Sequence, residues 1–219
     1  FIIDTGDSNL RDAALQDETN KLIKYFLASL TVPEDDLWVN LSPYEKDRII
    51  PDGFGTTEMG RDLLAQDYLL KQITSSLLYP DSDLGKKFWA KVYQKAKEKY
   101  GTIDIPVNTF NKVWVVPDKA KIYKHNNSAF VVNAHLRVML EEDYVALQKN
   151  THPRGGSTPG VDQLSTQIIR DLIIPELEKE VNEGKNFAQL RQVYNSLILA
   201  TWFKRNLKEN ILSKVYVGQ

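Results

Sequence analysis

Cysteine is missing from this chain of 219 residues. Without thiols the chain forms no disulfide, has no thiolate nucleophile and offers no Cys ligand to zinc. This absence fits a reducing cytosol and an oxidising periplasm equally well, so it does not define the compartment. Long hydrophobic runs are missing too, because the longest nearly apolar run, Leu197–Phe203, is far too short to span a bilayer.

Charge of one sign is also lacking, because 28 Lys and Arg residues balance 29 Asp and Glu residues. The net charge of −1 removes any global electrostatic case for binding nucleic acid or an anionic membrane, although local patches stay open. A composition of 42% hydrophobic and 26% charged residues is ordinary for a globular protein. We expect one α+β domain over residues 1–219.

Apolar residues at helical spacing predict that most of the chain is helical. The clearest expected helices span residues 19–30, 57–79, 84–100, 162–181 and 186–207. Pro175 is expected to break or kink the fourth of them, because a proline inside a helix removes a backbone hydrogen bond. The fifth has an apolar face wide enough for a central position in the fold.

The pattern changes to the two-residue period of β-strands between residues 109 and 140. From Phe130 to Leu140 the even-numbered residues are apolar, while Asn133, His135 and Arg137 are polar. Alternation of this kind is typical of a strand with one buried face. We therefore expect the even-numbered side chains, Val132 among them, to be buried.

Two reversals are expected within this segment. Val116–Lys119 has the composition of a turn, and Asn126–Asn127 marks a second reversal. A two-residue turn at Asn126–Asn127 would pair Ile122 with Val131, which has the wrong parity. We therefore expect a three-residue loop with an Asn in the left-handed region. The predicted fold is α+β and mostly helical, with a three-stranded antiparallel meander over about 109–140 packed against helices.

Histidine is scarce, with His125, His135 and His152 the complete set. On the expected meander the first two lie at opposite ends of different strands, too far apart to share a metal. No HExxH or HxH motif accompanies them, so neither a metal nor another cofactor is expected. His135, with Arg137 beside it, is a candidate general base. The favoured interpretation of this face is nevertheless a solvated or interface-facing polar strip.

Residues 151–160, THPRGGSTPG, form the most loop-like segment, and we expect it to be exposed and mobile. Its backbone N–H groups could cradle an anion, with Arg154 as the counter-charge. The segment lacks the GK[ST] ending of a phosphate loop, so a flexible connector is favoured. Neither GxSxG nor SxxK occurs in the chain. The weak catalytic candidates are therefore His135, Arg137, His152 and Arg154.

The expected helix over 84–100 is basic, with six lysines and one glutamate. Lys87, Lys91 and Lys95 follow one another at four-residue spacing and therefore share a face. They are the candidate contacts for an acidic partner, or for an acidic face of the same polypeptide. A solvated face whose lysine stems cover apolar surface is the alternative, and it is modestly favoured.

Three runs of the chain carry a resemblance to known sequences. They are LWVNLSPYEKDRIIPDGFGTTEMGRDLLAQDYLLKQ at 37–72, KVWVVPDKAKIY at 112–123 and HLRVMLEEDY at 135–144. They resemble segments of a family of uncharacterised bacterial proteins, often found in long polypeptides. The resemblance implies a bacterial origin and a chain that continues past Gln219, but no activity, cofactor or site residue. Because the chain starts at Phe1 rather than Met, we also expect a processed protein or an excised part of a longer one.

Three functions stay open. The first is a structural or protein-interaction module, which would contact another protein or another segment of the same polypeptide in a larger extracytoplasmic assembly. The second is a hydrolase-type enzyme that uses His135 or His152. The third is a small-ligand binder with a pocket between the meander and the 57–79 helix. The first is preferred, because no recognisable catalytic motif is present.

Overall fold

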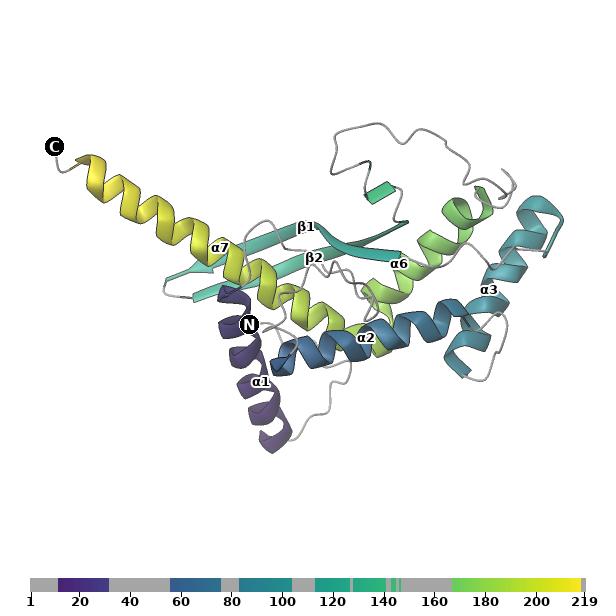
Figure 1. The fold of residues 1–219 in the computed structure, drawn as a ribbon, viewed down its shortest axis with the longest axis horizontal. Coiled ribbons are helices and arrows are strands. Elements are labelled where there is room, and N and C mark those ends of the chain that lie inside the picture. The colour runs from purple at the N-terminus through teal and green to yellow at the C-terminus, as the bar shows by residue number, and fades with distance from the viewer. Residues whose placement is uncertain are drawn as a thin grey trace.

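The structure is a computed structural model that describes residues 12–31, 56–75, 83–103, 113–126, 128–140, 143–144, 146 and 167–217. The fold is α+β and mostly helical, with a two-stranded antiparallel sheet packed against helices (Figure 1). In chain order the elements are α1 (Asp12–Leu30), α2 (Glu58–Ser75), α3 (Asp83–Tyr100), β1 (Val113–His125), β2 (Ser128–Leu140), η3 (Ile169–Ile173), α6 (Ile174–Glu183), η4 (Lys185–Phe187) and α7 (Ala188–Val217).

The predicted helices are present, and two of them differ from expectation in an informative way. A π-helical turn, η3, precedes α6, which has Pro175 in its first turn. This interruption of the α-helix confirms the predicted break, because proline has no N–H to continue the regular ladder. Helix α7 continues past the expected end at 207 to Val217. The helix extends this far because no Gly or Pro stops it between 185 and 217.

The sheet is a hairpin of two long strands, and the predicted meander was wrong in this respect. Pro117 and its neighbours do not turn, because β1 runs without interruption from Val113 to His125. The strands reverse between His125 and Ser128, which pair with each other, so the connection is two residues long. Asn126 has a φ of 51°, so the expected left-handed Asn is confirmed. No third strand pairs with the hairpin among the residues that the structure describes.

Two irregularities in the pairing explain why the expected loop length was wrong. Asp118 on β1 and Val132 on β2 each lack a partner, as the extra residue of a β-bulge does. The extra residue at Val132 changes the parity of β2, so Ile122 pairs with Val131 on the inner face after all. Val131 is buried and Val132 is 50% exposed, which corrects the expected burial of Val132. The alternation holds on the other side of the bulge, where Leu136, Val138 and Leu140 are buried.

Side chains of α6 occupy the outer edge of β2, where another strand would otherwise bind. The Asn182 side chain accepts a hydrogen bond from the Leu136 N–H at 2.9 Å and donates one to the Leu136 carbonyl at 2.7 Å. Glu178 accepts one from the Val138 N–H at 2.9 Å. A carboxamide presents the same donor and acceptor as a peptide unit, so α6 satisfies this edge without a third strand.

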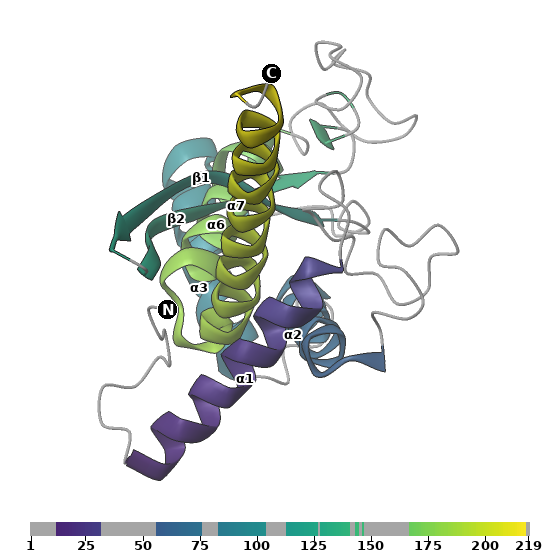
Figure 2. The same cartoon turned by 90° about the vertical axis from the view of Figure 1, so that its left-hand side faces the viewer.

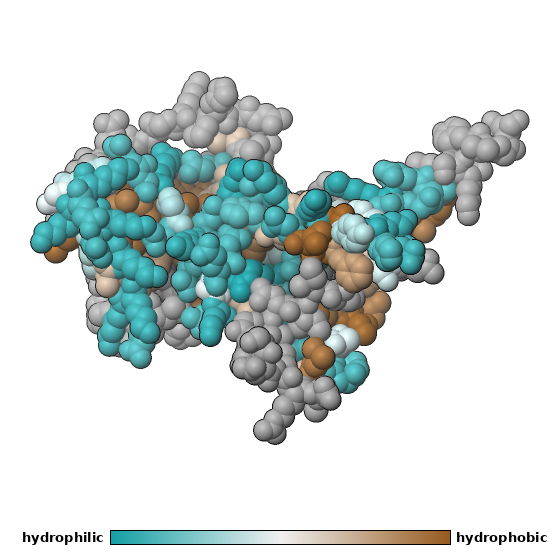
Figure 3. All heavy atoms as spheres, turned by 180° about the vertical axis from the view of Figure 1, so that it is seen from behind, coloured by the Kyte–Doolittle hydropathy of each residue, from teal (hydrophilic) through white to brown (hydrophobic). Residues whose placement is uncertain are grey.

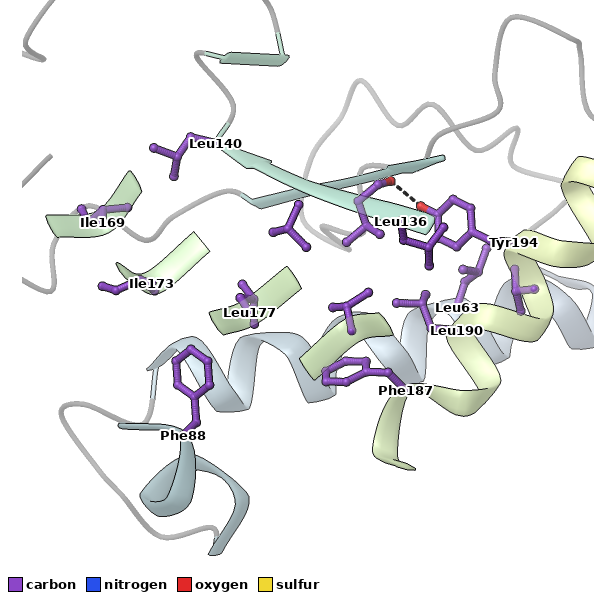
Figure 4. Close-up of a cluster of buried hydrophobic side chains, with 14 of the residues drawn as sticks. Leu63, Phe88, Leu136, Leu140, Ile169, Ile173, Leu177, Phe187, Leu190 and Tyr194 are labelled. Carbon is purple, nitrogen blue, oxygen red and sulfur yellow. Dashed lines mark hydrogen bonds between the residues drawn. The ribbon is translucent and has the colours of Figure 1, made fainter. Parts of the chain in front are cut away.

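The core connects the hairpin with every described helix. Buried side chains from α1, α2, α3, both strands and the C-terminal helices form one cluster, part of which is drawn in Figure 4. At its centre the Tyr194 hydroxyl of α7 donates a hydrogen bond to the Val115 carbonyl of β1 at 2.5 Å. Helix α7 lies between the hairpin and α1 (Figure 2). Its C-terminal half then projects beyond the body (Figure 1).

Candidate functional site

Two of the four catalytic candidates, His152 and Arg154, lie outside the described residues, and so does the rest of the 151–160 segment. The other two, His135 and Arg137, lie on β2 with their side chains 44% and 45% exposed. They point away from the face that carries Leu136 and Val138. The predicted polar strip is thus present at the base of the hairpin.

His135 lies between two carboxylates that sequence reasoning did not assign to it. Its Nδ1 is 3.7 Å from the Asp118 carboxylate, and its Nε2 is 3.5 Å from that of Glu178. The bulge at Asp118 turns this residue toward β2, where it also forms an ion pair with Arg137 at 2.5 Å. A turn was predicted at this position, so the sequence pattern had no signal that would place Asp118 beside His135.

The geometry of His135 suits a joint between β1, β2 and α6 better than a general base. A general base needs one imidazole nitrogen directed at a substrate proton, but here each nitrogen faces a carboxylate from a different element. Among the described residues, no group of three His, Cys, Asp or Glu side chains could hold a metal ion.

The lysines of α3 divide into two groups. Lys95 forms an ion pair with Glu176 of α6, and Lys99 forms one with Asp171 at 2.9 Å. Hydrogen bonds from Tyr100 and then from Lys99 hold the pKa of Asp171 below its ordinary value. Lys87 and Lys91, farther toward the start of the helix, are exposed. Part of this basic helix therefore meets an acidic face of the same chain.

A second polar network joins α1, α2 and α7, and no sequence pattern indicated it. Fully buried Tyr25 donates a hydrogen bond to Asp62 and accepts one from Gln189 at 2.6 Å. Gln189 also donates to Asp62 at 2.7 Å, and Lys21 lies 3.4 Å from the same carboxylate. Burial and then the Asp62 hydrogen bond raise the pKa of Tyr25 well above its ordinary value. Every member has a partner, so the network locks three helices together rather than offering a reactive group.

The feature with the clearest capacity to bind something is a groove between the hairpin tip, α1 and α7. Its volume is about 480 Å³. Its lining is Phe26, Lys124, Asn126, Ser128, Ala129, Leu199, Trp202, Phe203, Asn206, Leu207 and Asn210. The expected position of a pocket, between the sheet and the 57–79 helix, is not the position of this groove, because α2 contributes nothing to it. Sequence reasoning missed the groove because its walls come from three distant segments.

Exposed apolar side chains extend the groove on both sides. Phe203, Leu207 and Ile211 of α7 follow one another at four-residue spacing and are 44%, 50% and 54% exposed. Ile23 and Leu27 of α1, also four residues apart, are exposed as well. In Figure 3 hydrophobic residues gather where the projecting half of α7 leaves the body. We call this set, with the groove, the α1–α7 surface. An exposed contiguous patch of this kind is typical of a binding surface.

The groove is mostly apolar, with polar residues along its rim and a positive charge at one of them. Phe26, Leu199 and Trp202 belong to its apolar wall, and Asn206 and Asn210 to its polar part. Among the described residues that line it, Lys124 is the one with a charge, and none is a carboxylate.

Two facts bear on identity. Within the described residues, no helix combines the length and the apolar character needed to cross a membrane, α7 included.

The chain matches no protein-family model, no curated protein and no solved structure. The resemblance to uncharacterised bacterial proteins therefore stays a prediction, and the function is inferred from the geometry alone.

Proposed function

We propose that this chain is a protein-interaction module that binds an amphipathic helix of another protein in the groove of the α1–α7 surface. The single observation that carries the proposal is the continuity between the groove and the exposed side chains Phe203, Leu207 and Ile211. Together they make an apolar track along α7, bordered by α1 and the hairpin. A helix that lays its apolar face into such a track is a recurrent mode of peptide recognition.

The residue types along the track favour a protein partner. Trp202 and Phe203 provide large aromatic surfaces, and aromatic side chains are enriched among residues that dominate binding energy. Asn126, Asn206 and Asn210 can hydrogen-bond the polar edge of a bound helix. The first half of α7 is held firmly in the core, so the track is presented on a rigid support.

A small amphiphilic ligand is the second candidate, and the volume of the groove favours it. About 480 Å³ lies within the usual range of ligand pockets. The track, however, continues one turn beyond Leu207 onto Ile211, which does not line the groove. A small ligand would leave Ile211 exposed, whereas a helix of several turns would cover it.

The test uses Trp202 as a reporter inside the groove. A designed amphipathic helix of about 18 residues, five turns long, with leucines on one face and uncharged polar residues on the other, is titrated against the protein. We expect saturable binding that shifts the Trp202 fluorescence, measured against a Trp202→Phe background. Phe203→Ser combined with Leu207→Ser is expected to weaken binding at least tenfold, because two anchors of the track are removed.

The matched control is Leu15→Ser on α1. Leu15 is as exposed as Phe203, at 43% against 44%, but it does not line the groove. Binding that is unchanged in Leu15→Ser and lost in the double variant supports the proposal. No binding to the wild type, or equal losses in both variants, would overturn it. Binding of small amphiphiles without binding of any helix would favour the second candidate.

A further inference from the structure

The groove lies in a positively charged part of a chain that is nearly neutral overall. Residues 119–133 at the hairpin tip include three lysines and no carboxylate. Residues 199–210 of α7 include Lys204, Arg205 and Lys208 against Glu209. These two segments therefore carry six cationic side chains and one anionic one, whereas the whole chain has a net charge of −1. Excess charge of one sign around a concave apolar surface attracts partners of the opposite sign.

Lys124 is the cation that faces the occupant of the groove. It pairs across the hairpin with Ala129, and both residues line the groove. Lys119 and Lys121 pair instead with His135 and Asn133, on the opposite face of the sheet. They add to the field around the groove, but they cannot touch what binds there.

We infer that the partner helix is acidic along the edge that lies against the hairpin tip, and that Lys124 is the residue that selects it. This inference rests on the proposed function, since it names the chemistry of the helix that the groove binds. Lys124 forms a charge-assisted contact with a carboxylate on the partner. On the other side of the groove, Asn206 and Asn210 of α7 form hydrogen bonds with uncharged polar side chains of the partner helix. Selection between acidic and basic partners then comes from one wall of the groove.

Two other occupants fit the charges less well. A second copy of this chain would bring the same cationic segments together, so like charges would oppose its binding. An anionic membrane would attract the lysines, but a bilayer surface cannot enter a trough walled by the hairpin and α1. An acidic helix satisfies both the shape and the charge of the groove.

The experiment compares three peptides that share the leucine face of the designed helix. They differ along one edge, which carries glutamates in the acidic peptide, glutamines in the uncharged peptide and lysines in the basic peptide. For the wild type at low ionic strength we expect the acidic peptide to bind about fivefold more tightly than the uncharged one, and the basic peptide to bind least. Raising the salt to about 0.5 M should shrink these differences, because exposed charges are screened. Lys124→Glu is expected to weaken the acidic peptide about tenfold and to favour the basic one.

Lys121→Glu is the matched control, because it changes the net charge equally on the opposite face of β1. A smaller effect of Lys121→Glu than of Lys124→Glu supports the inference, and equal effects overturn it. Binding of all three peptides with one affinity also overturns it, while the proposed interaction module stands. Absence of binding by every peptide defeats the proposed function itself.

Two further measurements distinguish the other occupants. A Trp202 fluorescence response to phosphatidylserine vesicles, without a response to the acidic peptide, would assign the surface to a membrane and overturn the inference. Sedimentation equilibrium that finds a dimer in the wild type and a monomer in Phe203→Ser would assign it to a second copy, with the same consequence. A monomer that ignores the vesicles and binds the acidic peptide supports the inference.

Discussion

The two halves of α7 have similar stretches of apolar residues and opposite environments. From Ala188 to Thr201 nearly every side chain is buried or half-buried, polar Gln192 and Ser196 included. From Trp202 to Ile211 the side chains are exposed or half-exposed. The first half anchors the core and the second projects from it (Figure 1). One continuous helix thus provides both a deeply buried part of the core and a stripe of exposed apolar side chains.

The difference comes from what surrounds each half. In the first half Tyr194 bonds to β1, and Gln189 bonds to Tyr25 of α1 and Asp62 of α2. In the second half the contacts with the body lie at its start, where Lys204 donates a hydrogen bond to the Ser29 carbonyl of α1 at 3.3 Å, while the Asn206 side chain donates one to the Trp202 carbonyl of its own helix. The apolar residues there form a stripe rather than an all-round apolar surface. Such a helix is stable in water on its polar side and available for a partner on its apolar side.

The largest effect is expected from removing a large side chain in the first half of α7. Leu190→Ala deletes a fully buried side chain of the main core. We expect it to lower the free energy of unfolding by about 2–5 kcal/mol, from lost transfer energy and the cavity left behind. Leu207→Ala, the same change in the second half, should stay within about 0.5 kcal/mol. Urea denaturation of the two variants measures both, and equal losses would erase the contrast between the halves.

The next largest effect concerns the network that ties the first half of α7 to α1 and α2. Tyr25→Phe removes the hydroxyl that bonds to Asp62 and Gln189. Because the hydroxyl is buried, we expect a loss of about 1–3 kcal/mol near pH 8. The urea midpoint of Tyr25→Phe against that of the wild type provides the measurement. A variant as stable as the wild type would show that this network contributes nothing to holding α7.

The same pair of proteins should also differ in pH dependence. The pKa of Tyr25 is raised in the folded state, so its stabilising contribution is complete below the ordinary tyrosine value of about 10. As the pH rises above that value, the unfolded chain loses a proton that the folded chain keeps, and stability falls. Urea midpoints between about pH 8 and 11 should therefore converge for the wild type and Tyr25→Phe. A constant difference across this range would contradict the raised pKa.

A smaller contrast is expected where the hairpin meets the boundary between the halves. Val131 packs beside Ile198 and Leu199 of α7, whereas Val132 is half-exposed at the bulge. Val131→Ala should cost about 1–3 kcal/mol and Val132→Ala less than about 1 kcal/mol. Thermal unfolding of the two variants tests this directly. The reverse order would mean that the bulge lies elsewhere and that even-numbered residues face the core after all.

The smallest effects should come from exposed cations. Lys95→Ala breaks the ion pair with Glu176 between α3 and α6, at a cost below about 1 kcal/mol. Lys208→Ala in the projecting half of α7 should change stability by less than about 0.5 kcal/mol. The free energy of unfolding of both variants is measured by urea denaturation in low and high salt. Added salt lowers the stability of the wild type by screening the Lys95–Glu176 pair, and only Lys95→Ala should lose this effect. A large loss in Lys208→Ala would show that the projecting half is not free of the core.

The hairpin shows how far the residue pattern alone could lead. Alternation correctly identified a strand over 130–140, which lies within the observed strand Ser128–Leu140, and the burial of Leu136 and Val138. The Asn pair correctly located the reversal. The bulges at Asp118 and Val132 were not predictable from the pattern, because an inserted residue looks the same in the sequence as a regular one. Those bulges decided both the loop length and the position of Asp118 beside His135.

The candidate site was less predictable than the fold. His135 and Arg137 were identified as one polar strip, but Asp118 and Glu178, which contact His135, belong to elements with no local link to it. The groove joins residues near 26, 124–129 and 199–210. A side chain can be placed on the face of its own helix from local periodicity, but the face it meets depends on packing across long sequence separations.

By itself, the sequence determined the local elements of this protein, because hydrophobic period and stop signals act within a few residues. It determined a C-terminal helix with no internal Gly or Pro, a reversal near residue 126 with an Asn in the left-handed region, and a break near Pro175. Only the tertiary structure decided which half of that helix is covered. Burial depends on which distant surfaces are available to pack, and the side chains of 188–201 are buried or half-buried while those of 202–211 stay exposed or half-exposed. The uncovered half is the surface that we propose binds a partner.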